Sequence, residues 1–247
     1  MKIFTYATAI NQLKLDKKSL LNQNIAYDKI PQWVKSEDFL KLFLPYVEIV
    51  IDSREQDKFI ESACNYFGIK NTLAKKDKKA QTENLKEGDI SFKVMFGEKV
   101  YDFVGVCVWE RKGSANEWYN NIMGDRDRLN REMQRQVDKG YKKFVLMLEI
   151  GNCLYDLIDY EFYYYNHYGE RVNKTLGMHA FSTICSWKQS NHFDIEILQV
   201  DTQKGTKDER FKARTKLFFL MLYDMFYYFR NELRKECIEK ELIENEI

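Results

Sequence analysis

The stretch GVCVWERKGSANEW, residues 105–118, opens with an apolar run suited to a buried strand, and that run stops at Glu110, Arg111 and Lys112. Charges at the tip of a core strand are costly unless they are solvated, paired or bound to a metal. These residues therefore mark either a solvated strand end or a site. The rest of the chain decides between the two interpretations.

Strand-like and helix-like segments alternate around this stretch. The runs with the apolar or β-branched composition of strands are 47–52, 89–96, 100–110, 142–150 and 193–200. Helical spacing of apolar residues covers 56–68, 117–139, about 177–190 and about 208–240. The alternation predicts an α/β fold with a mixed central β-sheet flanked by helices on both faces.

The prolines, Pro31 and Pro45, precede the first predicted strand. We therefore predict an N-terminal extension over 1–45 and a single domain over 46–247. The polar and charged residues 73–88 predict a surface loop. The aromatic-rich segment 151–175 is predicted to be an insertion whose rings pack together rather than stack on unpaired bases.

Composition bounds the partners and the compartment. The formal net charge is +1, with 39 basic and 38 acidic residues, so binding to nucleic acid would need a local basic surface. The cysteines form no C-x-x-C pair and the histidines are isolated, which argues against a zinc cluster and a disulfide scaffold. A reducing cytoplasm is the simplest setting.

The most apolar run, 217–229, is shorter than the roughly 20 residues that a membrane span needs. The chain begins without the apolar region of a secretory signal. We therefore expect a cytoplasmic protein with no membrane partner. The apolar helix must be covered, either by the core of its own domain or by a second copy.

Carboxylates stand at three predicted strand edges: Asp52 after the first strand, Asp89 before the second and Glu110 at the end of the third. If these strands are neighbours, the carboxylates converge on one rim, where clustered negative charge requires a divalent cation. Lys112 follows two residues after Glu110. Such a set, with Mg²⁺ or Mn²⁺, is typical of metal-dependent phosphodiester cleavage.

The motifs VIDSRE (50–55), GD (88–89) and ERK (110–112) occur in the order used by the XPF-type structure-specific endonuclease domain of the PD-(D/E)XK nuclease superfamily. The chain resembles this family from about Val47 to Glu149, and more loosely to the last helix. The resemblance implies a restriction-endonuclease-like core. The chain resembles the compact, stand-alone members of the family that are found in bacteriophages and mobile elements. This resemblance implies a bacterial or phage-infected host cell.

Site roles follow from the resemblance. It implies that Asp89 and Glu110 bind the metal, that Lys112 acts on the nucleophilic water or the phosphate, and that Arg111 contacts substrate or locks the site. Three further residues would support or extend the site: Asp52, Arg54 and Glu55. Of these, Asp52 would be a further metal ligand.

One position departs from the family pattern. The family's aspartate after E-R-K-x-x-x corresponds to Asn116, which can accept a hydrogen bond but carries no charge. The neighbouring Glu117 would substitute for it only if the helix start shifts.

Basic residues crowd the helix after the site, among them Arg126, Arg128 and Arg131. They would serve as a track for DNA phosphates or as a solvated helix face with i,i+4 ion pairs.

The leading hypothesis is a Mg²⁺-dependent endonuclease that cuts branched DNA at a flap, fork or junction, with the branch preference implied by the family alone. A Holliday-junction resolvase is the enzymatic alternative. A catalytically impaired nuclease fold that serves as a DNA-binding or dimerisation partner is the other. The resemblance also favours a homodimer, through the apolar C-terminal helix.

Overall fold

The computed structural model describes residues 43–53, 58–74, 85, 88–96, 99–124, 126–189 and 195–239. The chain forms two compact units. Unit 1 comprises the described residues within Met1–Thr82, Phe92–Phe103 and Phe219–Ile247. Unit 2 comprises those within Glu83–Ser91 and Val104–Phe218. Strand β3 and helix α8 contribute residues to both units.

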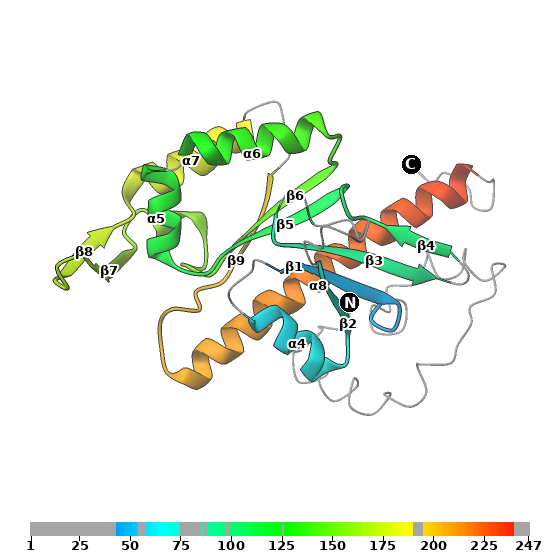
Figure 1. The fold of residues 1–247 in the computed structure, drawn as a ribbon, viewed down its shortest axis with the longest axis horizontal. Coiled ribbons are helices and arrows are strands. Elements are labelled where there is room, and N and C mark those ends of the chain that lie inside the picture. Colours follow the sequence, from blue (N-terminus) through cyan, green and yellow to red (C-terminus); the bar gives the residue numbers. More distant parts are fainter. Residues whose placement is uncertain are drawn as a thin grey trace. The chain divides into compact units, whose positions relative to one another are not determined.

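Unit 1 is built on parallel and antiparallel strand pairs (Figure 1). Its elements are β1 (Val47–Asp52), α4 (Phe59–Phe67), β2 (Lys70–Ala74), most of β3 (Ile90–Phe96), β4 (Lys99–Asp102) and the C-terminal part of α8 (Lys207–Glu239). Strand β1 lies between β2, to which it is parallel, and β3. Strand β4 also pairs with β3, in antiparallel orientation.

Aromatic side chains fill the core of unit 1. Phe43 lies against Phe226 from α8, with ring centroids 5.8 Å apart, and Phe92 from β3 stacks on Phe103 at 4.5 Å. All of these rings are buried. The apolar residues of α8 therefore meet the core of their own chain over much of their surface, while Leu220 and Tyr227 remain exposed.

Unit 2 is a parallel sheet covered by helices, with a separate hairpin (Figure 1). Its elements are β5 (Cys107–Lys112), α5 (Ala115–Met123), α6 (Arg126–Asp138), β6 (Lys143–Leu148), the 3₁₀ turn η3 (Leu154–Leu157), β7 (Glu161–Tyr165), β8 (Arg171–Thr175), α7 (Gly177–Gln189) and β9 (Ile195–Gln199). Strand β6 is parallel to β5 on one side and to β9 on the other. Ile90, at the start of β3, pairs with Trp109 of β5 in antiparallel orientation.

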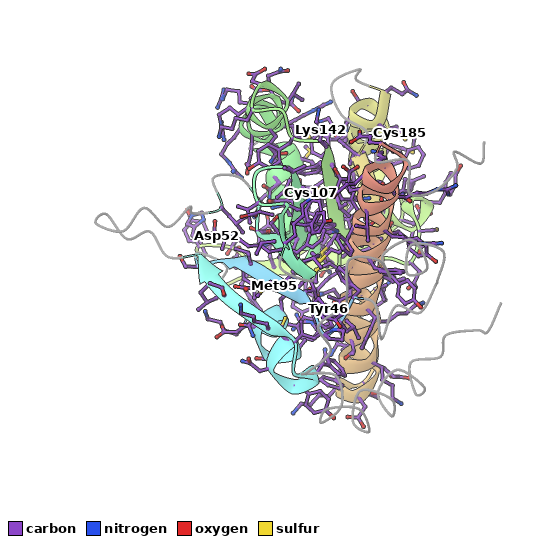
Figure 2. All side chains as sticks on the ribbon, turned by 90° about the vertical axis from the view of Figure 1, so that its right-hand side faces the viewer. Tyr46, Asp52, Met95, Cys107, Lys142 and Cys185 are labelled. Carbon is purple, nitrogen blue, oxygen red and sulfur yellow. The ribbon has the colours of Figure 1, made fainter. Side chains whose placement is uncertain are left out.

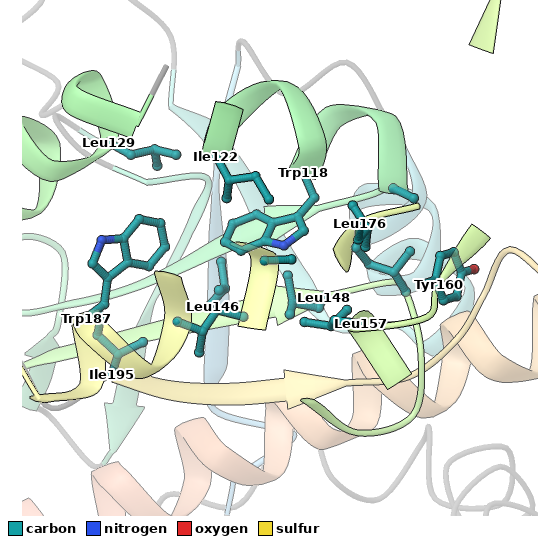
Figure 3. Close-up of a cluster of buried hydrophobic side chains, with 14 of the residues drawn as sticks. Trp118, Ile122, Leu129, Leu146, Leu148, Leu157, Tyr160, Leu176, Trp187 and Ile195 are labelled. Carbon is teal, nitrogen blue, oxygen red and sulfur yellow. The ribbon is translucent and has the colours of Figure 1, made fainter. Parts of the chain in front are cut away.

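The core of unit 2 lies between β6 and the helices (Figure 3). Every residue of β6 is buried. Trp118 from α5 meets Trp187 from α7 edge to face, with centroids 5.8 Å apart, above Leu146 and Leu148. This packing fixes the start of α5 against the end of β5, where the charged residues lie.

The predicted fold class is confirmed: the protein is α/β, with a mixed central sheet flanked by helices. Two predicted elements were too long. The strand 100–110 is interrupted by a turn at 104–106, where Gly105 has a φ of +82°, which favours glycine. The helix 117–139 is two helices, because the first ends at Gly124, and it begins earlier, after the N-cap Ser114.

Strand β2 was not predicted, since 70–74 is short and partly polar. Among the described residues, no helix combines the length and apolar character needed to cross a membrane.

Candidate active site

The end of β5 sorts its charges onto two faces. Glu110 and Lys112 are two residues apart and so share one face of the strand, while Arg111 points to the other. All three are buried, with exposed fractions of 7%, 5% and 5%. A solvated strand end is therefore excluded, and each charge must be offset by a partner inside the protein.

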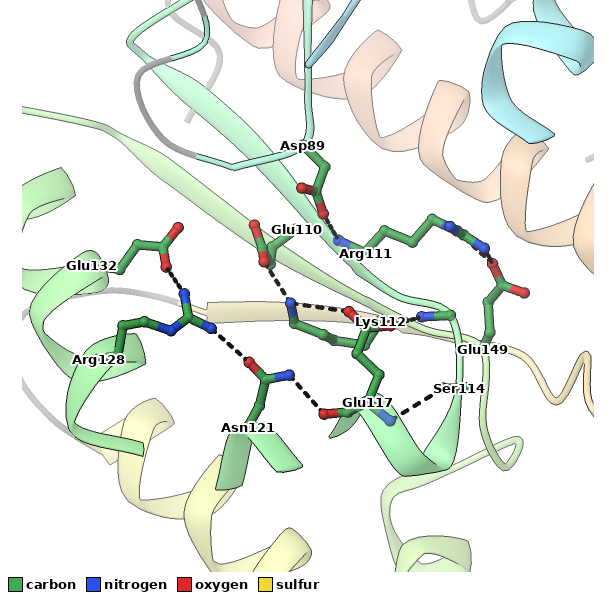
Figure 4. Close-up of polar contacts among 11 residues, drawn as sticks. Asp89, Glu110, Arg111, Lys112, Ser114, Glu117, Asn121, Arg128, Glu132 and Glu149 are labelled. Atoms are coloured by element: carbon green, nitrogen blue, oxygen red, sulfur yellow. Dashed lines mark hydrogen bonds and ion pairs between the residues drawn. The ribbon is translucent and has the colours of Figure 1, made fainter. Parts of the chain in front are cut away.

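Asp89 immediately precedes β3, at the point where this strand pairs with β5 in antiparallel orientation. It is the position before Ile90, which pairs with Trp109, and its backbone N–H donates to the Trp109 carbonyl at 3.2 Å. Its Oδ2 accepts from the backbone N–H of Arg111 at 2.8 Å (Figure 4). The negative charges of Asp89 and Glu110 both act on the Lys112 ammonium, so the two carboxylates belong to one site.

Lys112 places its ammonium among these carboxylates. Nζ lies 2.6 Å from Glu110 Oε1 and 3.5 Å from Glu117 Oε1 (Figure 4). Burial by itself disfavours the ammonium, but the negative charges of Glu110 and Asp89 outweigh it, and the pKa of Lys112 is raised above its ordinary value. The side chain is therefore a fixed cation at the end of β5.

The first turn of α5 supplies Glu117. Ser114 caps the helix by accepting from the Glu117 backbone N–H at 3.2 Å. The Glu117 carboxylate turns back and accepts from the Gly113 backbone N–H at 3.0 Å, which brings it within reach of Lys112. Asn116 is half-buried in the same turn and makes no side-chain hydrogen bond to Glu110 or Lys112 among the described residues. Glu117, and not Asn116, thus contacts the catalytic candidates.

On the opposite face of β5, Arg111 is locked to Glu149. Its Nε donates to Glu149 Oε1 at 2.5 Å, and its Nη2 forms an ion pair with the same carboxylate. Glu149 is 1% exposed and also accepts from Arg214 Nε at 3.0 Å and from the Thr202 hydroxyl at 2.5 Å. Arg111 therefore fixes the strand end.

Glu149 was not predicted as part of the site. Its sequence signal is a lone carboxylate directly after the fully buried β6, which runs parallel to β5. Its backbone N–H also donates to the Lys112 carbonyl at 3.1 Å, so it holds the end of β5 by main chain and side chain alike.

A chain of polar contacts leads from α5 to α6. Asn121 donates to the Glu117 carbonyl at 2.6 Å and accepts from Arg128 Nη2 at 3.0 Å, and Arg128 also pairs with Glu132 at 3.3 Å (Figure 4). The other arginines predicted to contact substrate, Arg126 and Arg131, are exposed on α6.

The other predicted site residues are Asp52, Arg54 and Glu55. Asp52 ends β1 in unit 1 and is 5% exposed (Figure 2). Its approach to Asp89 and Glu110 stays a prediction. Arg54 and Glu55 lie outside the described residues.

The donor set of the site fits a hard divalent cation. Within the part of the chain that the structure describes, no group of three or more His, Cys, Asp or Glu is placed to hold a metal. Mg²⁺ is commonly held by one or two carboxylates and completes its shell with water and substrate phosphate. Asp89 and Glu110 provide two carboxylates of this kind beside Lys112.

Comparison with known proteins finds a distant structural similarity. No family model and no curated protein matches the chain. Among solved structures, the chain is similar to XPF from Aeropyrum pernix, with 12% sequence identity and a TM-score of 0.40, over 73% of this chain and 69% of that one.

Proposed function

We propose that the protein is a metal-dependent DNA endonuclease that hydrolyses phosphodiester bonds. The observation that carries the proposal is the pair of carboxylates, Asp89 and Glu110, that act on the Lys112 ammonium at one strand end. Carboxylate oxygens and a fixed cation are the groups that in-line attack of water on a phosphodiester requires. The order of the sequence motifs supports the same chemistry.

Asp89 and Glu110 would hold Mg²⁺ or Mn²⁺. The bound ion would supply a water of lowered pKa and offset the charge that builds on the phosphate. The protein keeps the two carboxylates in register through the β3–β5 pairing and through the bond from the Arg111 backbone to Asp89. The Arg111–Glu149 pair secures the same strand from its other face.

Lys112 donates hydrogen bonds from Nζ to the attacking water or to a non-bridging phosphate oxygen. Its position is set by Glu110 and Glu117, so little reorganisation is needed when negative charge develops. The Glu117 side chain is 43% exposed and lies on the solvent side of this pair, where its Oε1 can accept a proton from water.

DNA would approach over α6. Arg128, Arg131 and Arg135 are spaced so that they share one exposed stripe of the helix, and Arg128 is linked to the site through Asn121. We propose that these side chains contact phosphates and that the preferred substrate is branched DNA. We also propose a homodimer through the apolar face of α8 that bears Leu220 and Tyr227.

The test is cleavage of end-labelled flap, fork, four-way-junction and linear duplex DNA with Mg²⁺, with Mn²⁺ or with chelator. The native chain is compared with Asp89→Asn and with Glu232→Gln, an exposed carboxylate of α8 in unit 1 that serves as the matched control. We expect metal-dependent cutting that Asp89→Asn abolishes and Glu232→Gln leaves unchanged.

The ranking of substrates separates the alternatives. Strongest cutting of flaps or forks supports the structure-specific nuclease, and equal or stronger cutting of four-way junctions indicates a resolvase. Binding of branched DNA without cutting under any condition overturns the enzyme and leaves the impaired partner. Light scattering during chromatography tests the dimer, which a monomer at all concentrations contradicts.

A further inference from the structure

The β7–β8 hairpin of unit 2 displays tyrosine rings on its outer face. Tyr163 pairs with Asn173 and Tyr165 pairs with Arg171, so these side chains stand on one face of the ribbon. Tyr163 is 54% exposed and Tyr165 is 66% exposed. Their ring centroids are 6.1 Å apart and the ring planes lie at 86° to each other, edge to face. Each exposed ring therefore offers a separate face on which a base can stack.

Side-chain hydrogen bonds hold the tip of the hairpin. At its tip, Asn166 accepts from the backbone N–H groups of Tyr168 and Glu170 and donates to the Glu170 carboxylate at 3.0 Å. Arg171 lies over the ring of Tyr163, with its guanidinium carbon 4.2 Å from the ring centroid. A surface ordered in advance loses less entropy when a ligand binds.

The inner face of the hairpin is anchored on α5. Phe162 packs on Tyr119 with centroids 5.5 Å apart, and Lys174 Nζ lies 5.9 Å from the centre of the same ring. Tyr119 is two residues after Glu117, so the hairpin stands beside the helix whose first turn enters the candidate active site (Figure 1). The predicted packed cluster is therefore correct for the inner rings and wrong for the outer ones, which are left in solvent.

Charge and shape around the rings suit a nucleic acid strand. A hollow of about 520 Å³ is lined by residues of both strands. Its ionic groups are two cations, Arg171 and Lys174, and one carboxylate, Glu161. Aromatic rings provide affinity for bases of any sequence, and neighbouring cations provide affinity for the backbone.

We propose that the outer face of the β7–β8 hairpin binds single-stranded DNA, with bases stacked on Tyr163 and Tyr165 and a phosphate contacted by Arg171, which shares that face. The inference rests on the proposed function, because a branched DNA substrate would bring an unpaired strand next to the active site. Stacking needs unpaired bases, so duplex DNA should not use this surface.

Fluorescence anisotropy of the full chain with a labelled oligothymidylate of about 15 nucleotides tests the proposal, in chelator so that no cutting occurs. The double variant Tyr163→Ala/Tyr165→Ala should lose about ten-fold or more in affinity for the single strand. The double variant Tyr163→Phe/Tyr165→Phe keeps the rings, so its affinity for the single strand should stay within about twofold of that of the native chain. Its affinity for duplex DNA should also stay within about twofold.

Tyr155→Ala is the matched control, because Tyr155 is 71% exposed in unit 2 but lies on η3, outside the hairpin. Circular dichroism should show the native spectrum for all variants. Unchanged affinity of the alanine variant for the single strand overturns the proposal. An equal loss of its affinity for duplex DNA also overturns it, because that would indicate phosphate contacts alone. A shift in the monomer–dimer equilibrium with unchanged DNA binding would instead assign the face to a second copy.

These outcomes are independent of catalysis. If the native chain cuts no DNA in any metal but its single-strand affinity depends on the two rings, the hairpin site stands and the proposed nuclease falls. If the chain cuts branched DNA and the rings are dispensable for single-strand binding, the nuclease stands and the hairpin site falls.

Discussion

Asp89 and Glu110 both act with their negative charge on the Lys112 ammonium, next to the pair that Ile90 of β3 forms with Trp109 of β5. The two carboxylates are 21 positions apart in the sequence, yet the antiparallel pairing of β3 with β5 brings both to one site. Lys112, on the same face of β5, lies 2.6 Å from Glu110. The site thus depends on strand register, which a one-residue slip would destroy because it turns Glu110 and Lys112 to the opposite face.

Replacing Lys112 by methionine should cost both stability and activity. The change leaves Glu110 buried without its cation, which destabilises a protein by about 3–5 kcal/mol. The free energy of unfolding, from urea denaturation, measures this loss.

The double variant Glu110→Gln/Lys112→Met separates the two effects. It removes both charges, so we expect it to recover most of the lost stability and to remain unable to cut DNA. Recovery of cutting along with stability would show that neither residue acts in the chemistry.

Glu149→Gln should destabilise the fold through Arg111. The variant weakens the pairing of two arginines with a carboxylate that is 1% exposed, and breaking such a buried pair costs about 3–5 kcal/mol. The midpoint of thermal unfolding should fall well below that of the native chain, while Lys235→Ala, at an exposed ion pair of α8, should leave it almost unchanged. An unchanged midpoint for Glu149→Gln would contradict the structural role given to this pair.

Asn116→Asp should change the cleavage rate little. The side chain at 116 makes no described hydrogen bond to Glu110 or Lys112, whereas Glu117 reaches Lys112 and Gly113. Glu117→Gln should therefore slow cutting by at least about ten-fold. The opposite ranking, with a large gain from Asn116→Asp and no loss from Glu117→Gln, would restore position 116 as the family's acidic site.

Cys64 should resist alkylation in the native protein. Burial raises the pKa of its thiol to about 12, against about 8.5 in an unfolded chain, so the thiolate is scarce at moderately alkaline pH. Since the folded state holds this proton more tightly, the contribution to stability is complete below about pH 8.5 and declines as the pH rises toward 12. Mass spectrometry after brief iodoacetamide treatment should find the exposed Cys153 modified well before Cys64, and equal labelling would refute the burial.

Local patterns predicted most of the elements correctly. The apolar run before Glu110 predicted a buried strand, although β5 begins later and ends later than the predicted strand 100–110. The charged triplet at its tip left solvated, paired and metal-bound charges open, and the structure shows Lys112 paired with Glu110. Gly124 was a visible weakness in the helical pattern, and α5 ends there.

Relations between distant segments escaped prediction. Glu149 is far from Arg111 in sequence, and only the parallel pairing of β6 with β5 brings the two together. Strand β2 has a weak local pattern and is formed by pairing with β1. The outward rings of the hairpin could not be told from the packed ones, since alternate residues of one strand have opposite environments.

Single-turnover cleavage of a labelled flap substrate, followed against Mg²⁺ concentration, tests the central claim most directly. The native chain, Glu110→Gln, Asp89→Asn and the control Glu232→Gln are compared. We predict that cutting requires the metal, that each site variant slows it by at least about 100-fold, and that the control cuts like the native chain. Cutting that persists without metal, or at the native rate in both site variants, would contradict the account.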